Sequence, residues 1–177
     1  MTMKLYFDPQ SRSQVAKWML DEAGVDYEIV TTLLKEGAHK KPEFLKINPA
    51  GKLPALVDGR TRVFENAAIC MYVAEKFPGK RLAPPVGSPE RGRYLSLMVY
   101  STSQLEPAMG DAIMKIRSNN SARGWTNFEA AKDAVERELG DGIAPITLAP
   151  QDVTRVLLNL LSNGFYAARE RQRMETI

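Results

Sequence analysis

The order of secondary-structure patterns in the first 77 residues limits the fold more than any other feature of the sequence. A strand pattern at residues 4–7 precedes a helical pattern with Val15, Trp18 and Met19 on one face, which Gly24 ends. A second strand pattern follows at residues 26–30. Strand, helix and strand in this order predict a parallel β-strand pair joined by a crossover helix.

The next segment predicts a hairpin and a helix. Residues 35–46 are polar and are expected to include a short helix. The stretch LPALVDG at 53–59 combines a proline, a short apolar strand and a tight-turn signal, and a return strand is expected at 61–64. With a further helix at 65–77, the whole block has the order βαβαββα.

A stretch rich in proline and glycine at residues 78–88 predicts a division into domains 1–80 and 81–177. The second domain has only helical patterns, the first of them from about residue 88 to 117. Thr126 and Glu129 have the spacing of a capping box, which predicts the start of another helix.

Composition excludes several classes of function. The net charge is +3, but acidic and basic residues are interspersed, so no nucleic-acid partner is expected. The single cysteine, Cys70, allows no internal disulfide, and the single histidine, His39, makes neither a zinc site nor a hydrolytic triad. Without a signal peptide or a long apolar run, the chain is expected to be cytoplasmic, with no membrane partner.

Three short segments carry residues that could do chemistry. Leu53 and Pro54 precede a strand, where a proline is either a plain turn residue or exposes backbone groups to an extended peptide. Glu65 and Asn66 open a helix, where they either cap it or hold the ammonium and carboxylate groups of a ligand. Between the first strand and helix, the segment 11–13 offers serine hydroxyls that either cap the helix or stabilise a thiolate.

These segments lie within stretches that together resemble the cytosolic, bacterial-type glutathione S-transferases. The stretches are MKLYFDPQSRSQVAKWMLDEAGVDYEIV at 3–30, PEFLKINPAGKLPALVDG at 42–59, FENAAICMYVAEKFPGKRLAPP at 64–85 and SPERGRYLSLMVYSTSQLEPAM at 88–109. The resemblance covers roughly residues 3–139.

The resemblance implies an α/β thioredoxin-like N-terminal domain and an all-α, glutathione-transferase-like C-terminal domain. It implies conjugation of reduced glutathione to small electrophiles, a role in detoxification, a homodimer, and no cofactor or metal beyond glutathione as co-substrate. By position, Ser11 matches the catalytic residue, with Arg12 and Ser13 as alternatives. The residues that match glutathione-binding positions are Lys52, Leu53, Pro54, Glu65 and Asn66.

The sequence departs from the family after about residue 140, where the expected helices are missing and the helical domain is therefore expected to be truncated. The tail at about 142–172 resembles the asparagine-bearing helix of sensor histidine kinase ATPase domains, with Asn159 or Asn163 at the matching position. No glycine-rich segments follow, so no ATP binding is expected; this helix could simply replace the missing one. The departure leaves a second function open, a glutathione-binding or protein-interaction module with little or no turnover. Tyr94, Met98 and Tyr100 could line an electrophile pocket, or serve as core or dimer contacts.

Overall fold

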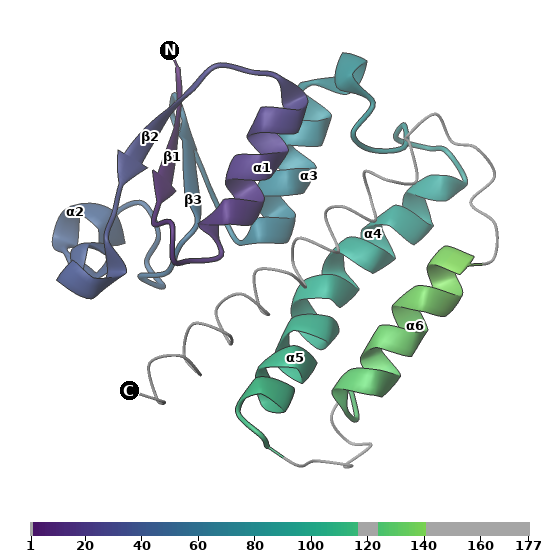
Figure 1. Cartoon of the computed structure of the whole chain (residues 1–177). Coiled ribbons are helices and arrows are strands. Elements are labelled where there is room, and N and C mark those ends of the chain that lie inside the picture. The colour runs from purple at the N-terminus through teal and green to yellow at the C-terminus, as the bar shows by residue number, and fades with distance from the viewer. Residues whose placement is uncertain (1, 117–123, 141–177) are drawn as a thin grey trace. The chain divides into compact units, whose positions relative to one another are not determined.

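The computed structural model describes residues 2–116 and 124–140 (Figure 1). The chain forms two compact units, Met1–Leu82 and Ala83–Ile177, and the boundary falls within the proline- and glycine-rich stretch. None of the helices in the described ranges is long and apolar enough to cross a membrane.

The first unit contains a four-stranded mixed sheet. Its strands are β1 (Met3–Phe7), β2 (Tyr27–Thr31), β3 (Ala55–Asp58) and β4 (Thr61–Phe64). Their order in the sheet is β2-β1-β3-β4, with β1 and β2 parallel and the other two pairs antiparallel. This topology confirms the predicted thioredoxin-like order of elements.

Two helices, α1 (Ser13–Ala23) and α3 (Asn66–Lys76), pack against each other beside the sheet (Figure 1). Gly24 ends α1 with a left-handed φ of 59°, a conformation that glycine adopts without steric penalty. Alternate residues of β1 are buried on the helix-covered side, as the two-residue period of a strand requires. The apolar core of this unit includes Leu5, Val15, Leu20, Leu56, Ile69 and Val73.

The short helix α2 (Pro42–Leu45) packs on the sheet through an aromatic pair. The rings of Phe44 and Tyr6 meet edge to face, with their centroids 5.6 Å apart. Two 3₁₀ turns, Leu34–Glu36 and Ala38–Lys40, precede α2, and a third, Pro78–Lys80, follows α3.

The second unit begins with α4 (Glu90–Tyr100), a π-helical turn (Ser101–Leu105) and α5 (Glu106–Ile113). Within the helical stretch predicted from about residue 88 to 117, the chain is helical from Glu90 to Ile113, with a π-helical turn in its middle. Pro107 has no N–H to offer the carbonyl four residues earlier, and its ring crowds that carbonyl, so the chain widens into a π turn just before it.

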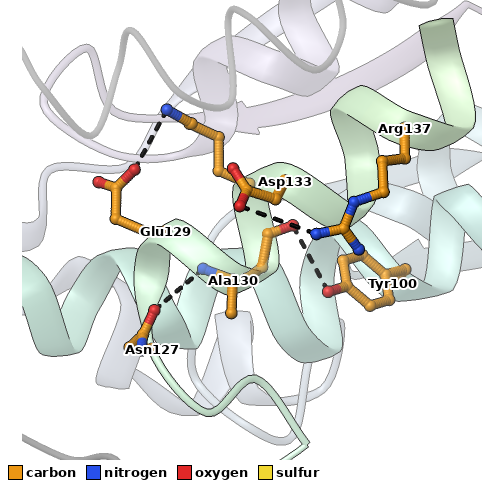
Figure 2. Close-up of polar contacts among 8 residues, drawn as sticks. Tyr100, Asn127, Glu129, Ala130, Asp133 and Arg137 are labelled. Atoms are coloured by element: carbon orange, nitrogen blue, oxygen red, sulfur yellow. Dashed lines mark hydrogen bonds and ion pairs between the residues drawn. The ribbon is translucent and has the colours of Figure 1, made fainter.

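Helix α6 (Phe128–Gly140) begins one residue later than the capping-box pattern predicted. The Asn127 side chain accepts the Ala130 N–H at 2.9 Å, so Asn127 and not Thr126 is the capping residue (Figure 2). Thr126 instead has a φ of 52°.

Contacts along and beside α6 stabilise this unit. Glu129 pairs with Lys132 at 3.2 Å and Asp133 with Arg137 at 3.8 Å, both along the helix surface. The Tyr100 hydroxyl of α4 lies 3.5 Å from a carbonyl oxygen of α6, so Tyr100 packs against that helix (Figure 2). The buried apolar residues here are Leu105, Ala108, Ala131 and Val135.

Candidate functional site

Three segments that are distant in sequence meet at one edge of the sheet in the first unit. In the register, Tyr6 pairs with Ala55 and Ala55 pairs with Phe64. Because β3 is antiparallel to both neighbours, the loop after β1, the segment before β3 and the residue after β4 emerge at the same edge. These three segments carry all the predicted site residues, namely Ser11, Arg12, Ser13, Lys52, Leu53, Pro54, Glu65 and Asn66.

Ser11 is half-buried in the loop between β1 and α1. Its Oγ accepts the Ser13 N–H at 3.1 Å. The same Oγ lies 2.9 Å from the Asp8 carbonyl oxygen and 2.6 Å from Ser13 Oγ, and either oxygen can accept a hydrogen bond from the Ser11 hydroxyl. That carbonyl also accepts the Ser11 N–H at 3.0 Å, so it stays paired if the hydroxyl proton turns to another acceptor. Near the positive end of α1, Ser11 can therefore donate to an anion.

Ser13 is fully buried and has a different environment. Its hydroxyl donates to the Asp8 carbonyl oxygen at 2.9 Å and accepts the Asp8 N–H at 3.1 Å. A buried hydroxyl engaged in this way holds the loop and does not face a ligand. Of the two serines, Ser11 is therefore the one whose hydroxyl can meet a ligand.

Arg12 lies on the surface between the two serines, and its guanidinium interacts with Glu65. Partial desolvation lowers the pKa of Arg12, and the attraction of the Glu65 carboxylate opposes that change. A guanidinium remains charged at physiological pH, so Arg12 is not a proton acceptor. Its interaction with Glu65 instead links the loop after β1 electrostatically with the residue after β4.

Leu53 and Pro54 are joined by a cis peptide bond at the start of β3. The pairing of β3 begins at Ala55, and the Leu53 backbone has no hydrogen-bond partner among the described residues. An extended peptide backbone could therefore pair with Leu53. Lys52 is exposed beside it, and the Asn48 side chain holds the Lys52 carbonyl at 2.8 Å.

Glu65 has an unfavourable backbone conformation, with φ of 72° and ψ of 132°. Steric repulsion makes a positive φ rare for residues with a Cβ, and a residue held there stores about 1–3 kcal/mol. Glu65 is exposed and immediately precedes α3, so burial of its side chain does not account for this backbone conformation. Residues held in such conformations cluster at functional sites, which makes Glu65 a candidate.

Asn66 is the first residue of α3 and is 4% exposed. Its Oδ1 is buried and has no hydrogen-bond partner in the described part of the chain. An unpaired buried polar atom costs about 1–3 kcal/mol, and a donor group of a bound ligand would satisfy it. The first N–H groups of a helix are also available to an anion.

Two residues near this edge were not identified from the sequence. Lys40 donates to the Gly51 carbonyl oxygen at 3.0 Å, which brings a second cation to the loop before Leu53. No local pattern indicated it, because 11 residues separate the two partners. Asn48, which is 1% exposed, also accepts the Ala50 N–H at 3.0 Å, and its Asn-Pro turn signal could have identified it.

Comparison with known proteins shows the family to which the chain belongs. Residues 1–75 match the model of the glutathione S-transferase N-terminal domain. Glutathione S-transferase 1 from Dianthus caryophyllus is 31% identical over 173 residues, covering 87% of this chain and 77% of that relative. The chain belongs to the glutathione S-transferase family. Glutathione S-transferase 3 from Zea mays is 46% identical over 89 residues, but the match spans 49% of this chain and only 40% of the maize transferase.

Solved transferases share the fold. A glutathione transferase from Methylococcus capsulatus has a TM-score of 0.69 and 25% identity, covering 98% of this chain and 93% of its own. A sphingomonad glutathione S-transferase, solved in complex with glutathione, has a TM-score of 0.65 and 28% identity, covering 88% and 81%. The departure from the family expected after about residue 140, and the kinase-like tail with Asn159 or Asn163, lie outside the described residues.

Proposed function

We propose that this chain binds reduced glutathione and conjugates its thiol to small electrophiles. The observation that carries the proposal is the meeting of Ser11, Leu53 and Glu65 at one edge of the sheet. A hydroxyl donor, an unpaired backbone segment and a carboxylate beside a helix N-terminus match the thiol, the peptide backbone and the γ-glutamyl head of glutathione.

In this proposal each part of the tripeptide meets a separate segment of the chain. The Glu65 carboxylate binds the ammonium group, while the NH₂ group of the Asn66 amide and the first N–H groups of α3 donate to the carboxylate beside it. The cysteinyl backbone pairs with Leu53 next to Pro54. Lys52, with Lys40 close to the same loop, attracts the glycyl carboxylate.

The chemical step begins with loss of the thiol proton to water. Ser11 donates a hydrogen bond to the resulting thiolate, and the positive end of α1 adds to its stabilisation, so the pKa of the bound thiol falls below about 8.5. The sulfur lone pair then forms a bond to an electrophilic carbon, and the bond to the leaving group breaks with its electron pair. Ser11 keeps its own proton throughout.

A glutathione-binding module without turnover is the second candidate. It is favoured by the departure of the sequence from the family pattern after about residue 140, in the helical half of the chain. Binding and turnover are separable measurements, so the two candidates predict different results with the same protein.

The test is calorimetric titration of the protein with reduced glutathione, alongside Glu65→Ala. Glu22→Ala is the matched control, because Glu22 is also exposed in the first unit but lies on α1, remote from the Glu65 segment in sequence. We expect Glu65→Ala to weaken binding about 10- to 100-fold and Glu22→Ala to leave it unchanged. Absence of binding by the folded wild type rejects both candidates. Binding without conjugation of an activated aryl halide supports the second.

We also propose that the protein is a cytoplasmic homodimer. Leu95 and Val99 lie one helical turn apart on α4 and are 40% and 56% exposed, which suits a subunit contact. Sedimentation velocity should give twice the chain mass of 19.7 kDa, and a monomer would reject this assembly.

A further inference from the structure

We propose that Asp8 is a positioning residue that holds the Ser11 hydroxyl in place for a bound thiol. The inference rests on the glutathione site proposed above and assigns a role to a residue outside it. Asp8 directly follows β1 and is 4% exposed. A buried carboxylate requires hydrogen-bond donors, and the donors to Asp8 come from the backbone of two separate segments.

The Asp8 carboxylate bridges these two segments. Its Oδ1 accepts the Gln10 N–H at 2.7 Å, which closes a turn across the intervening proline. Its Oδ2 accepts the Leu34 N–H at 2.7 Å, from the segment that follows β2. Both bonds have the short length typical of charge-assisted hydrogen bonds. The loop that carries Ser11 is thus tied to a position 26 residues further along the chain.

The backbone of Asp8 sets the direction of the serine side chains. Its carbonyl oxygen lies 2.9 Å from both Ser11 Oγ and Ser13 Oγ, and it accepts the Ser11 N–H at 3.0 Å. Its own N–H donates to Ser13 Oγ at 3.1 Å. A carboxylate that fixes the peptide groups of Asp8 therefore also fixes the position of the Ser11 hydroxyl.

The role should appear in the pKa of the bound thiol and not in the affinity for glutathione in its protonated form. Displacement of a reacting group by about 1 Å can reduce a rate about 100-fold. Leu53 and Glu65, which would bind the rest of the tripeptide, lie on other segments of the chain. Arg12, the neighbouring cation, remains in every variant below.

The first test compares Asp8→Asn, Ser11→Ala and the double variant. Asparagine keeps one oxygen but places an NH₂ group against one of the two backbone N–H groups, so the bridge is broken. We expect a higher pKa for the thiol of bound glutathione, read from its ultraviolet thiolate absorbance against pH, and about tenfold slower turnover. The glutathione Kd, measured at a pH below the pKa of the bound thiol, should stay within about threefold. Because Asp8 acts through Ser11, the double variant should have the same thiol pKa as Ser11→Ala alone.

The second test breaks the bridge from its other end. Leu34→Pro removes the N–H that Asp8 accepts, and the local backbone accommodates proline, because Leu33 is extended and Leu34 opens a 3₁₀ turn. Leu34→Ala is the matched control, since it shortens the side chain and keeps the N–H. We expect Leu34→Pro to raise the thiol pKa as Asp8→Asn does, and Leu34→Ala to match the wild type.

The outcomes separate this inference from the proposed function. A wild type that binds no glutathione rejects the proposed function and this inference with it. A wild type that binds, with an unchanged thiol pKa in both Asp8→Asn and Leu34→Pro, overturns the inference alone. Additive effects of Asp8→Asn and Ser11→Ala, or unfolding of both bridge variants, would also overturn it, since Asp8 would then support the fold and not Ser11.

Discussion

The strained backbone at Glu65 gives a prediction in which two variants differ in stability but lose glutathione binding to the same extent. Glu65→Ala and Glu65→Gly both remove the carboxylate and its interaction with Arg12, so their difference isolates the effect of the φ of 72°. In this region a residue with a Cβ destabilises the folded state by about 1–3 kcal/mol. Glycine avoids that strain but lowers the stability by about 0.5–1 kcal/mol, because it has greater freedom in the unfolded chain. Glu65→Gly should therefore be more stable than Glu65→Ala by about 0.5–2 kcal/mol.

Urea unfolding followed by tryptophan fluorescence measures this difference. The chain has two tryptophans, so a Trp125→Phe background leaves Trp18, on α1, as the reporter of the first unit. Calorimetric titration on the same proteins should show that both variants bind glutathione about 10- to 100-fold more weakly than the wild type. If Glu65→Gly is no more stable than Glu65→Ala, the positive φ stores no strain. If Glu65→Gly binds glutathione as well as the wild type, the carboxylate has no role in binding.

Three further predictions concern the thiol site, the packing of α3 and the buried cysteine. Ser11→Ala should slow turnover about 100-fold and raise the pKa of the bound glutathione thiol by about one to two pH units, and the glutathione affinity measured below that pKa should be unchanged. Undiminished turnover in a steady-state assay would contradict a thiolate role. Tyr72→Phe removes a 2.6 Å hydrogen bond to the nearly buried Asp58 carboxylate, so urea unfolding should show a free energy of unfolding lower by about 1–3 kcal/mol. The Tyr27 hydroxyl contacts an exposed carboxylate, so Tyr27→Phe should lower it less, and equal losses would contradict the importance of burial. Burial raises the pKa of the Cys70 thiol from its ordinary 9.0 to about 12, so its contribution to stability is complete below about pH 9 and is lost as the pH rises toward 12. The loss should be about 1.4 kcal/mol per pH unit and smaller in Cys70→Ala, and parallel pH profiles for the two proteins would contradict it.

Much of the first unit followed from the sequence because its signals are local. The apolar stripe that ends at Gly24 predicted α1, and the Asp58-Gly59 pair predicted the β3–β4 hairpin. Periodicity and turn chemistry act over a few residues, so they are readable before the chain is folded. The same signals placed Leu53 and Glu65 beside strand ends, which made them candidates for a site.

Tertiary structure decided what depends on partners distant in sequence. The sequence does not distinguish Ser11 from Ser13 as a candidate. Only the folded loop buries Ser13 and leaves Ser11 able to meet a ligand. The bridge from Asp8 to Leu34 likewise exists only because β1 and β2 are parallel neighbours, so their following loops leave the sheet at the same edge. The sequence by itself determined the elements and their order, since these are set by short-range periodicity. Strand register and burial determined which side chains share the site, since these depend on contacts that no local pattern contains.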